Sequence, residues 1–206
     1  MISVSLANKE NVPYEELFQV MKEAFKERFE QGLDFTCLSW SFEEFISKLR
    51  NDTILIAKNV DDKIIGFERL YFEDDFVHCG LIAVLPNYKR KGIGSLLFKT
   101  AEQLVLSRNC KYMLADTAVD AKSSVKWHLR NGFNIVGIDS GPNTNYYSYL
   151  FRKQLVHDSK WSNPLYSYFH FLLSALKCRL CYDRCGNYTT AMLIYKRLRD
   201  SIHQQR

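Results

Sequence analysis

A basic, glycine-containing run is the segment of this chain whose residue types and spacing are best suited to chemistry. The run is Lys89–Ser95, with glycines at positions 92 and 94, and it lies between an apolar stretch that ends at Pro86 and an amphipathic stretch that begins at Gly94. A strand that leads through such a loop into a helix leaves the first N–H groups of the helix unpaired and partly positive. Glycine lets the backbone approach a bulky anion, and the flanking basic residues add charge. The run therefore predicts a pyrophosphate-binding loop, with an ordinary solvated basic loop as the alternative.

A second motif lies downstream, where a predicted helix passes into a strand. The helix covers 123–131 and carries Trp127 and His128 near its end, followed by Gly132 and Phe133. Glycine suits the left-handed position that closes a helix. His128 is a candidate for proton transfer because imidazole titrates near neutral pH, and the alternative is that it only caps or lines the helix.

The rest of the sequence predicts the helices and strands that position these motifs. Apolar residues at helical spacing predict a helix over 14–30, and Ser41 with Glu44 forms a capping box that begins a second helix. The predicted elements, in order, are helices 14–30 and 41–50, strands 53–58, 63–72 and 76–85, helix 94–108, strand 112–117, helix 123–131, and strands 133–138 and 145–152. Strand 76–85 is mostly apolar, so we expect it to be buried on both faces. This order predicts an α/β domain with a mixed sheet, in which helices cross over the central strands.

Both motifs and the element order resemble the GNAT superfamily of acetyl-CoA-dependent N-acyltransferases. The family's acyl-CoA motif is [Arg/Gln]-x-x-Gly-x-[Gly/Ala], and this chain has Lys89, Gly92 and Gly94 at the three defined positions. Lysine keeps the charge of the first position but lacks a planar donor fork. The second motif is similar to the family's helix ending in Tyr-x-x-x-Gly-Phe, with His128 in place of Tyr. The resemblance covers residues 1–155 and implies a GNAT-like fold, in which a mixed, splayed central sheet is flanked by helices.

The resemblance also implies which residues meet the co-substrate, acetyl-CoA. In this family the pantetheine arm lies between the two splayed central strands and pairs with the backbone of the strand before the loop. The residues expected to bind are Ile82 and Val84 for the pantetheine arm, and Lys89, Arg90, Lys91, Gly92, Ile93, Gly94 and Ser95 for the pyrophosphate. No metal is expected.

Direct attack of an amine on the thioester needs the amine to be neutral and the leaving thiolate to receive a proton. An amine with a pKa of about 10.4 requires roughly 4–5 kcal/mol to be deprotonated at pH 7, so a general base is useful. In the family the acid is commonly the Tyr that His128 replaces, so the resemblance implies that His128 donates the proton. The alternative donors are tyrosines of the last predicted strand, Tyr146, Tyr147 and Tyr149.

The family's base is often a Glu eleven residues before the first position of the acyl-CoA motif. That position is His78 in this chain. Glu68 on the neighbouring strand and Asp116 at the end of the next one are the alternatives. Each of these residues could equally be an ordinary paired surface carboxylate or a hydrogen-bonded histidine.

Residues 156–206 form a basic, aromatic-rich extension. The net charge of the chain is +5, and all of it arises here because residues 1–155 hold equal numbers of basic and acidic side chains. Two helices are expected, Pro164–Tyr182 and Thr189–His203, which pack on the domain or on a second copy of the chain; attachment to an anionic membrane surface is the alternative. Cysteines 178, 181 and 185 share one helix face, which suits packing better than metal binding because no fourth ligand is evident.

The sequence thus predicts an N-acetyltransferase that moves an acetyl group from acetyl-CoA to an amine of a small molecule or amino sugar. The alternatives are a catalytically silent acyl-CoA-binding module and an acetyltransferase for protein Lys or N-termini. No nucleic-acid binding is expected because residues 1–155 are neutral overall, and no stable membrane insertion because no apolar run is long enough. A homodimer is a candidate assembly. The scattered cysteines and the lack of a signal-peptide pattern predict a cytoplasmic protein.

Overall fold

The computed structural model describes residues 2–139, 146–158, 160–161 and 163–181. It divides the chain into two compact units, Met1–Ala115 with Arg152–His157 and Asp116–Phe151 with Asp158–Arg206. The predicted domain boundary near Val156 is not tested by this division and stays a prediction.

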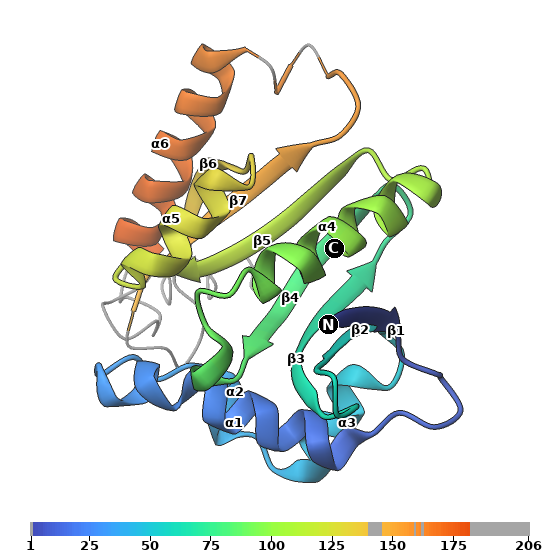
Figure 1. The fold of residues 1–206 in the computed structure, drawn as a ribbon. Coiled ribbons are helices and arrows are strands. Elements are labelled where there is room, and N and C mark those ends of the chain that lie inside the picture. Colours follow the sequence, from blue (N-terminus) through green and yellow to red (C-terminus); the bar gives the residue numbers. More distant parts are fainter. Residues whose placement is uncertain (1, 140–145, 159, 162, 182–206) are drawn as a thin grey trace, which may run out of the picture. The chain divides into compact units, whose positions relative to one another are not determined.

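In the first unit the strands follow the order β1-β2-β3-β4-β5 (Figure 1). The pairs from β1 to β4 are antiparallel and β4 pairs with β5 in parallel, so the sheet is mixed. The elements are β1 (Ser3–Leu6), α1 (Tyr14–Glu30), α2 (Thr36–Ser39), α3 (Phe42–Leu49), β2 (Thr53–Lys58), β3 (Ile64–Phe72), β4 (Phe76–Val84), the 3₁₀ helix η1 (Pro86–Tyr88), α4 (Ile93–Ser107) and β5 (Tyr112–Ala118), whose last three residues belong to the second unit. The sequence predicted all of these except β1, α2 and η1, which are too short for a hydrophobic period to show.

Helices cover both faces of this sheet. On one face, α1 and α3 each bury their apolar side against the sheet. Leu17 and Met21 of α1 and Phe45 of α3 belong to the same core as Phe67 of β3 and Ala83 of β4. The predicted capping box begins α3, since Ser41 Oγ accepts from the N–H of Glu44, whose carboxylate accepts from the N–H of Ser41. α4 packs on β2, β3 and β4 from the other face.

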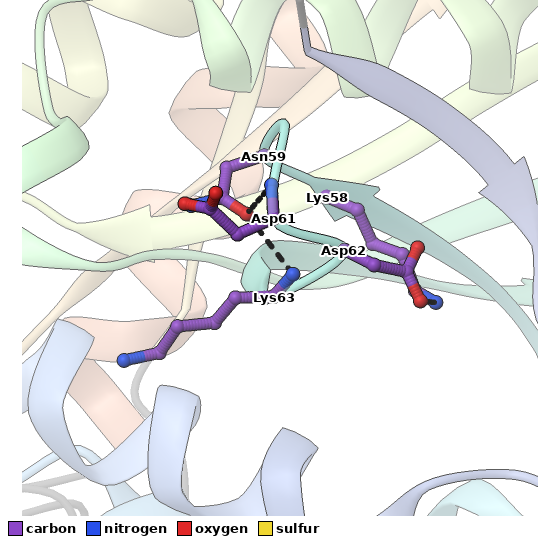
Figure 2. Close-up of polar contacts among 5 residues, drawn as sticks. All are labelled: Lys58, Asn59, Asp61, Asp62 and Lys63. Atoms are coloured by element: carbon purple, nitrogen blue, oxygen red, sulfur yellow. Dashed lines mark hydrogen bonds and ion pairs between the residues drawn. The ribbon is translucent and has the colours of Figure 1, made fainter.

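The turn between β2 and β3 is held by one asparagine. Asn59 Oδ1 accepts from the N–H groups of Asp61 and Lys63, both at 3.0 Å, and Lys58 forms an ion pair with Asp62 at 2.9 Å (Figure 2). Asp62 has a φ of 61°, a left-handed conformation that aspartate tolerates in tight turns. The predicted hairpin is confirmed.

The central sheet is splayed, as predicted. β4 pairs with β5 only from Phe76, opposite Tyr112, to His78, opposite Leu114. Beyond His78, β4 has a strand partner only on its β3 side within the described part of the first unit. The prediction that β4 is buried on both faces is wrong, because several of its residues are only half-buried where the pairing with β5 has ended.

In the second unit the strand order is β5-β7-β6. The other elements of this unit are α5 (Lys122–Arg130), β6 (Asn134–Asp139), β7 (Ser148–Gln154), whose last three residues belong to the first unit, and α6 (Pro164–Cys181). Gly132 closes α5 with a φ of 83°, and the next N–H, that of Phe133, donates to the carbonyl of His128 at 3.1 Å, so the predicted glycine cap is confirmed. The second predicted helix of the extension, 189–203, lies outside the described residues.

Side chains of α6 bond the backbone of β6, the end strand of this order. His170 Nδ1 lies 2.8 Å from the carbonyl oxygen of Val136. Ser174 Oγ accepts from the N–H of Ile138 at 2.9 Å, and Cys178 Sγ donates to the carbonyl of Ile138 at 3.2 Å. These bonds occupy backbone N–H and C=O groups of β6 that could otherwise pair with another strand. α6, the helix of the extension that is described, therefore packs on a strand of its own chain.

Candidate active site

The loop between β4 and α4 has a backbone that places two residues in left-handed conformations. Arg90 has a φ of 62° and Gly92 a φ of 81°, and Gly92 is the N-cap residue directly before α4. A Cβ built at Gly92 would meet no atom within 4 Å. Glycine is therefore favoured here by its φ and not by crowding, and the space in front of it is open to a ligand.

The first turn of α4 presents free backbone donors at this loop. Its first hydrogen bond runs from the N–H of Leu96 to the carbonyl of Gly92 at 2.9 Å. The preceding N–H groups, those of Ile93, Gly94 and Ser95, have no acceptor inside the helix. Ile93 is buried and anchors the turn in the core. Three donors and the positive end of the helix dipole thus face the same space, which suits an anion.

The basic side chains of the loop are not equivalent. Lys89 forms an ion pair with Glu27 of α1 at 2.7 Å, and the hydrogen bond and charge of Lys89 hold the pKa of Glu27 below its ordinary value. Lys91 lies over the ring of Tyr88, with Nζ 5.2 Å from the ring centre. Arg90 and Lys91 are exposed, so their charges are available to a ligand.

The loop is also attached to the hairpin that precedes it in the sequence. The Oη of Tyr88 lies 3.3 Å from Nδ2 of Asn59, the residue that holds the β2–β3 turn. This contact positions η1, and with it the start of the basic loop.

A β-bulge lies in β4 ahead of the loop. Ile82 pairs with Glu68 and Cys79 pairs with Leu70, so that two residues of β4 oppose Arg69 alone. Bulges bend a strand and are frequent beside active sites, because they re-aim its groups. Ile82 and Val84, the two residues predicted to meet the pantetheine arm, lie between this bulge and the loop on the stretch of β4 that β5 does not pair.

Glu68 is buried in the sheet without a hydrogen-bond partner among the described residues. Its exposure is 0%, and neither carboxylate oxygen is bonded. Burial raises the pKa of Glu68 from 4.5 to about 8. The thiol of Cys79 is a weak donor that lowers this pKa, but its effect is smaller than that of burial. Burial, then the charge of Glu68, raises the pKa of Cys79 as well. Burial therefore favours the protonated, neutral form of Glu68 at pH 7.

The two candidate bases of the first unit are not brought together. His78 pairs with Tyr71, whereas Cys79, which approaches Glu68, pairs with Leu70. Because successive strand residues point to opposite faces, His78 and Glu68 face opposite sides of the sheet. His78 is half-buried, and Glu68 is fully enclosed.

His128 lies in the second unit, inside a cluster of aromatic rings. Its ring stacks on Phe151 with the centroids 4.6 Å apart, and Trp127 and Phe133 meet it edge-on. Nδ1 lies 2.9 Å from the carbonyl of Ser124, so it carries a proton and Nε2 presents a lone pair. Burial lowers the pKa of His128, while the bond to Ser124 and the charge of Asp116 oppose this shift.

Among the alternative donors, Tyr149 lies in the same cluster as His128. Its ring is 6.3 Å from that of Phe151, which is two residues along β7 and stacks on His128. Tyr146 is buried, and Tyr147 accepts the N–H of Val119 at its carbonyl. The sequence did not indicate that Phe151 joins His128 and Tyr149, since no local pattern links β7 to α5.

No group of three His, Cys, Asp or Glu side chains that could hold a metal occurs in the part of the chain that the structure describes. Cys178 instead donates to a carbonyl of β6. No helix within the described ranges is both long enough and apolar enough to cross a membrane.

Comparison with known proteins agrees with this fold. The Acetyltransferase (GNAT) family model matches residues 14–133. The fold is similar to the ribosomal-protein-S18-alanine N-acetyltransferase from Escherichia coli, at 16% identity and a TM-score of 0.64, with 78% of this chain and 97% of that chain covered. It is similar to the PaiA N-acetyltransferase from Thermoplasma acidophilum in complex with coenzyme A, at 19% identity and a TM-score of 0.62, with 75% and 99% covered. A third similar structure is the IAA acetyltransferase from Bacillus cereus, at 16% identity and a TM-score of 0.57, with 75% and 100% covered.

The family match covers more than half of the chain, and this protein therefore belongs to the GNAT acetyltransferase family. It is an acyltransferase, with the mixed, splayed sheet that the sequence predicted.

Proposed function

We propose that this enzyme transfers an acetyl group from acetyl-CoA to an amine of a small molecule or amino sugar, by direct attack of the amine on the thioester. The observation that supports this proposal best is the start of α4. There, a left-handed glycine whose Cβ position is open is followed by three N–H groups without helical acceptors and preceded by two exposed basic side chains.

In this proposal the pyrophosphate of acetyl-CoA accepts hydrogen bonds from Ile93, Gly94 and Ser95. Arg90 and Lys91 supply charge around it, and Lys89 does so as well when it exchanges Glu27 for the phosphate. A helix N-terminus of this kind binds phosphate groups through its donors and its dipole. The pantetheine amides pair with the backbone of β4 at Ile82 and Val84, where β4 has a free edge in the described part of the first unit.

The protonation states suggest how the catalytic roles divide. A buried, neutral His128 whose Nδ1–H already bonds Ser124 has no proton to give at Nε2. We therefore assign it the positioning of the aromatic cluster, and assign proton donation to Tyr149 on the same cluster. The phenol of a tyrosine carries an O–H that can act as a donor. His78 is the candidate base, since Glu68 is enclosed and already neutral.

The experiment is turnover of acetyl-CoA, followed as release of the free thiol, with a panel of amino sugars, small amines, an N-terminal alanine peptide and a lysine peptide. We expect turnover with at least one small amine or amino sugar. Turnover confined to the peptides would show that the acceptor class is wrong. CoA binding with no turnover on any acceptor would show that the chain is a silent binding module.

A further inference from the structure

α6 has one face fixed against β6 and the opposite face covered with large apolar side chains. His170, Ser174 and Cys178, one helical turn apart, make the bonds to β6 and so define the inward face. The large apolar residues that are 45–77% exposed are Leu165, Tyr168, Phe169, Leu172, Leu173, Leu176 and Leu180. They recur every three or four positions, so they form one continuous stripe, which we call the α6 apolar face.

Such a face normally has a partner. Single exposed leucines are common on proteins, but a contiguous stripe of this size marks an interaction surface. α6 contains no acidic residue, and its only basic residues are Lys177 and Arg179. Its apolar face is thus not broken by charge over most of its length.

The segment that directly follows α6 has a complementary pattern. Gly186 and Asn187 are turn residues placed soon after the end of α6. The next residues, 189–203, have an apolar side chain at every third or fourth position and carry the basic Lys196, Arg197 and Arg199 between these positions, a pattern that predicts an amphipathic helix. The apolar stripe consists of Ala191, Ile194, Tyr195, Leu198 and Ile202.

The lengths of the two stretches also match. A helix of residues 189–203 would be about 22 Å long, and the 18 residues of α6 extend over about 27 Å. A short connection between two helices favours their antiparallel packing. Because the segment is covalently tethered to α6, its effective concentration at the α6 apolar face is on the order of millimolar. Neither a second copy nor a membrane surface has this advantage.

We propose that the α6 apolar face is the docking site of the chain's own residues 189–203, which complete a helical hairpin on the outer side of α6. The segment then buries its own apolar stripe together with that of α6. This inference is independent of the CoA site.

The test is limited digestion of the full-length chain with trypsin, since Lys196, Arg197 and Arg199 lie within the segment. In the docked state these bonds are protected, and cleavage follows the fraction of undocked segment. Leu176→Asp introduces a charge into the face and should speed cleavage at these sites at least tenfold. The matched control is Leu106→Asp on α4, because Leu106 is 49% exposed and Leu176 54%. This control should leave the rate unchanged.

Leu198→Asp tests the same contact from the segment and cannot disturb α6 directly, so it should speed cleavage as Leu176→Asp does, with an unchanged far-UV circular dichroism spectrum. Equal, fast cleavage in the wild type and in both variants would overturn the proposal. So would a wild-type dimer that Leu176→Asp converts to monomer, because a second copy would then occupy the face. Binding of the wild type to vesicles rich in phosphatidylglycerol, lost in Leu176→Asp, would overturn it in favour of a membrane surface.

Discussion

Replacing Glu68 by Gln should remove a pH-dependent loss of stability that the buried carboxyl imposes. The folded pKa of Glu68 is raised by burial to about 8, whereas its ordinary value is 4.5. Between these two values the folded state holds a proton that the unfolded state releases. The free energy of unfolding therefore falls as the pH rises, by about 1.4 kcal/mol per pH unit from this group alone.

The magnitude follows from the width of that pH range. From pH 4.5 to pH 8 the loss approaches 4–5 kcal/mol, a large part of the stability of an ordinary domain. Glutamine has nearly the same shape and does not ionise, so this slope should vanish in Glu68→Gln. Its amide leaves a buried donor without a partner, at a cost of about 1–3 kcal/mol. The variant should therefore be less stable than the wild type at pH 5 and more stable at pH 8.

The assay is denaturant unfolding of both proteins at each pH unit from 5 to 9. Amide hydrogen exchange of the β3 and β4 peptides reports on the first unit by itself. The control is Glu16→Gln, an exposed carboxylate on α1, which should reproduce the pH dependence of the wild type. Parallel profiles for the wild type and Glu68→Gln, within about 0.5 kcal/mol over this range, would refute the burial of an isolated carboxyl.

Three further predictions address the loop, the acid and α6. Lys89→Met should weaken CoA binding about tenfold by calorimetry, the value of one charged hydrogen bond, whereas Glu27→Gln should strengthen it a few-fold by releasing Lys89; equal affinities would remove Lys89 from the site. Tyr149→Phe should lower the turnover rate by about 10²–10⁴-fold and His128→Phe, which keeps the aromatic stack, by only a few-fold; the reverse order would return the donor role to His128. Ser174→Ala should lower the free energy of unfolding by about 1–3 kcal/mol, since the N–H of Ile138 loses its acceptor; an unchanged unfolding midpoint would show that this bond is not needed.

The features that could be predicted from the sequence depend on residues close together in the chain. The capping box at Ser41 and the glycine cap at Gly132 each involve a few adjacent positions, and both are present. The basic loop is also local, because a strand, two glycines and a helix start suffice to define it. The strand and helix order followed from hydrophobic periods, and only the shortest elements were missed.

The rest of the site depends on contacts between distant residues, which carry no local signal. The bulge opposite Arg69 reflects the register of two strands, and the state of Glu68 reflects what surrounds it after packing. Burial lowers the pKa of His128, and Phe151, whose ring stacks on it, lies more than twenty residues away in the sequence. The bonds of α6 to β6 are of the same kind, since a helix period does not show which strand the helix will cover.

The most direct test of the central claim is calorimetric titration of CoA into the wild type, Gly92→Val and Gly32→Val. The two glycines are matched, since their φ values are 81° and 78° and a Cβ at either one would meet no atom within 4 Å. Valine should therefore strain both backbones alike, and only the side chain at position 92 would enter the space assigned to the pyrophosphate. We predict that the wild type and Gly32→Val bind CoA with the same Kd, and that Gly92→Val binds at least about a hundredfold more weakly, a loss of about 2.7 kcal/mol. An unchanged Kd in a folded Gly92→Val variant, or no CoA binding by the wild type, would contradict the assignment of this loop.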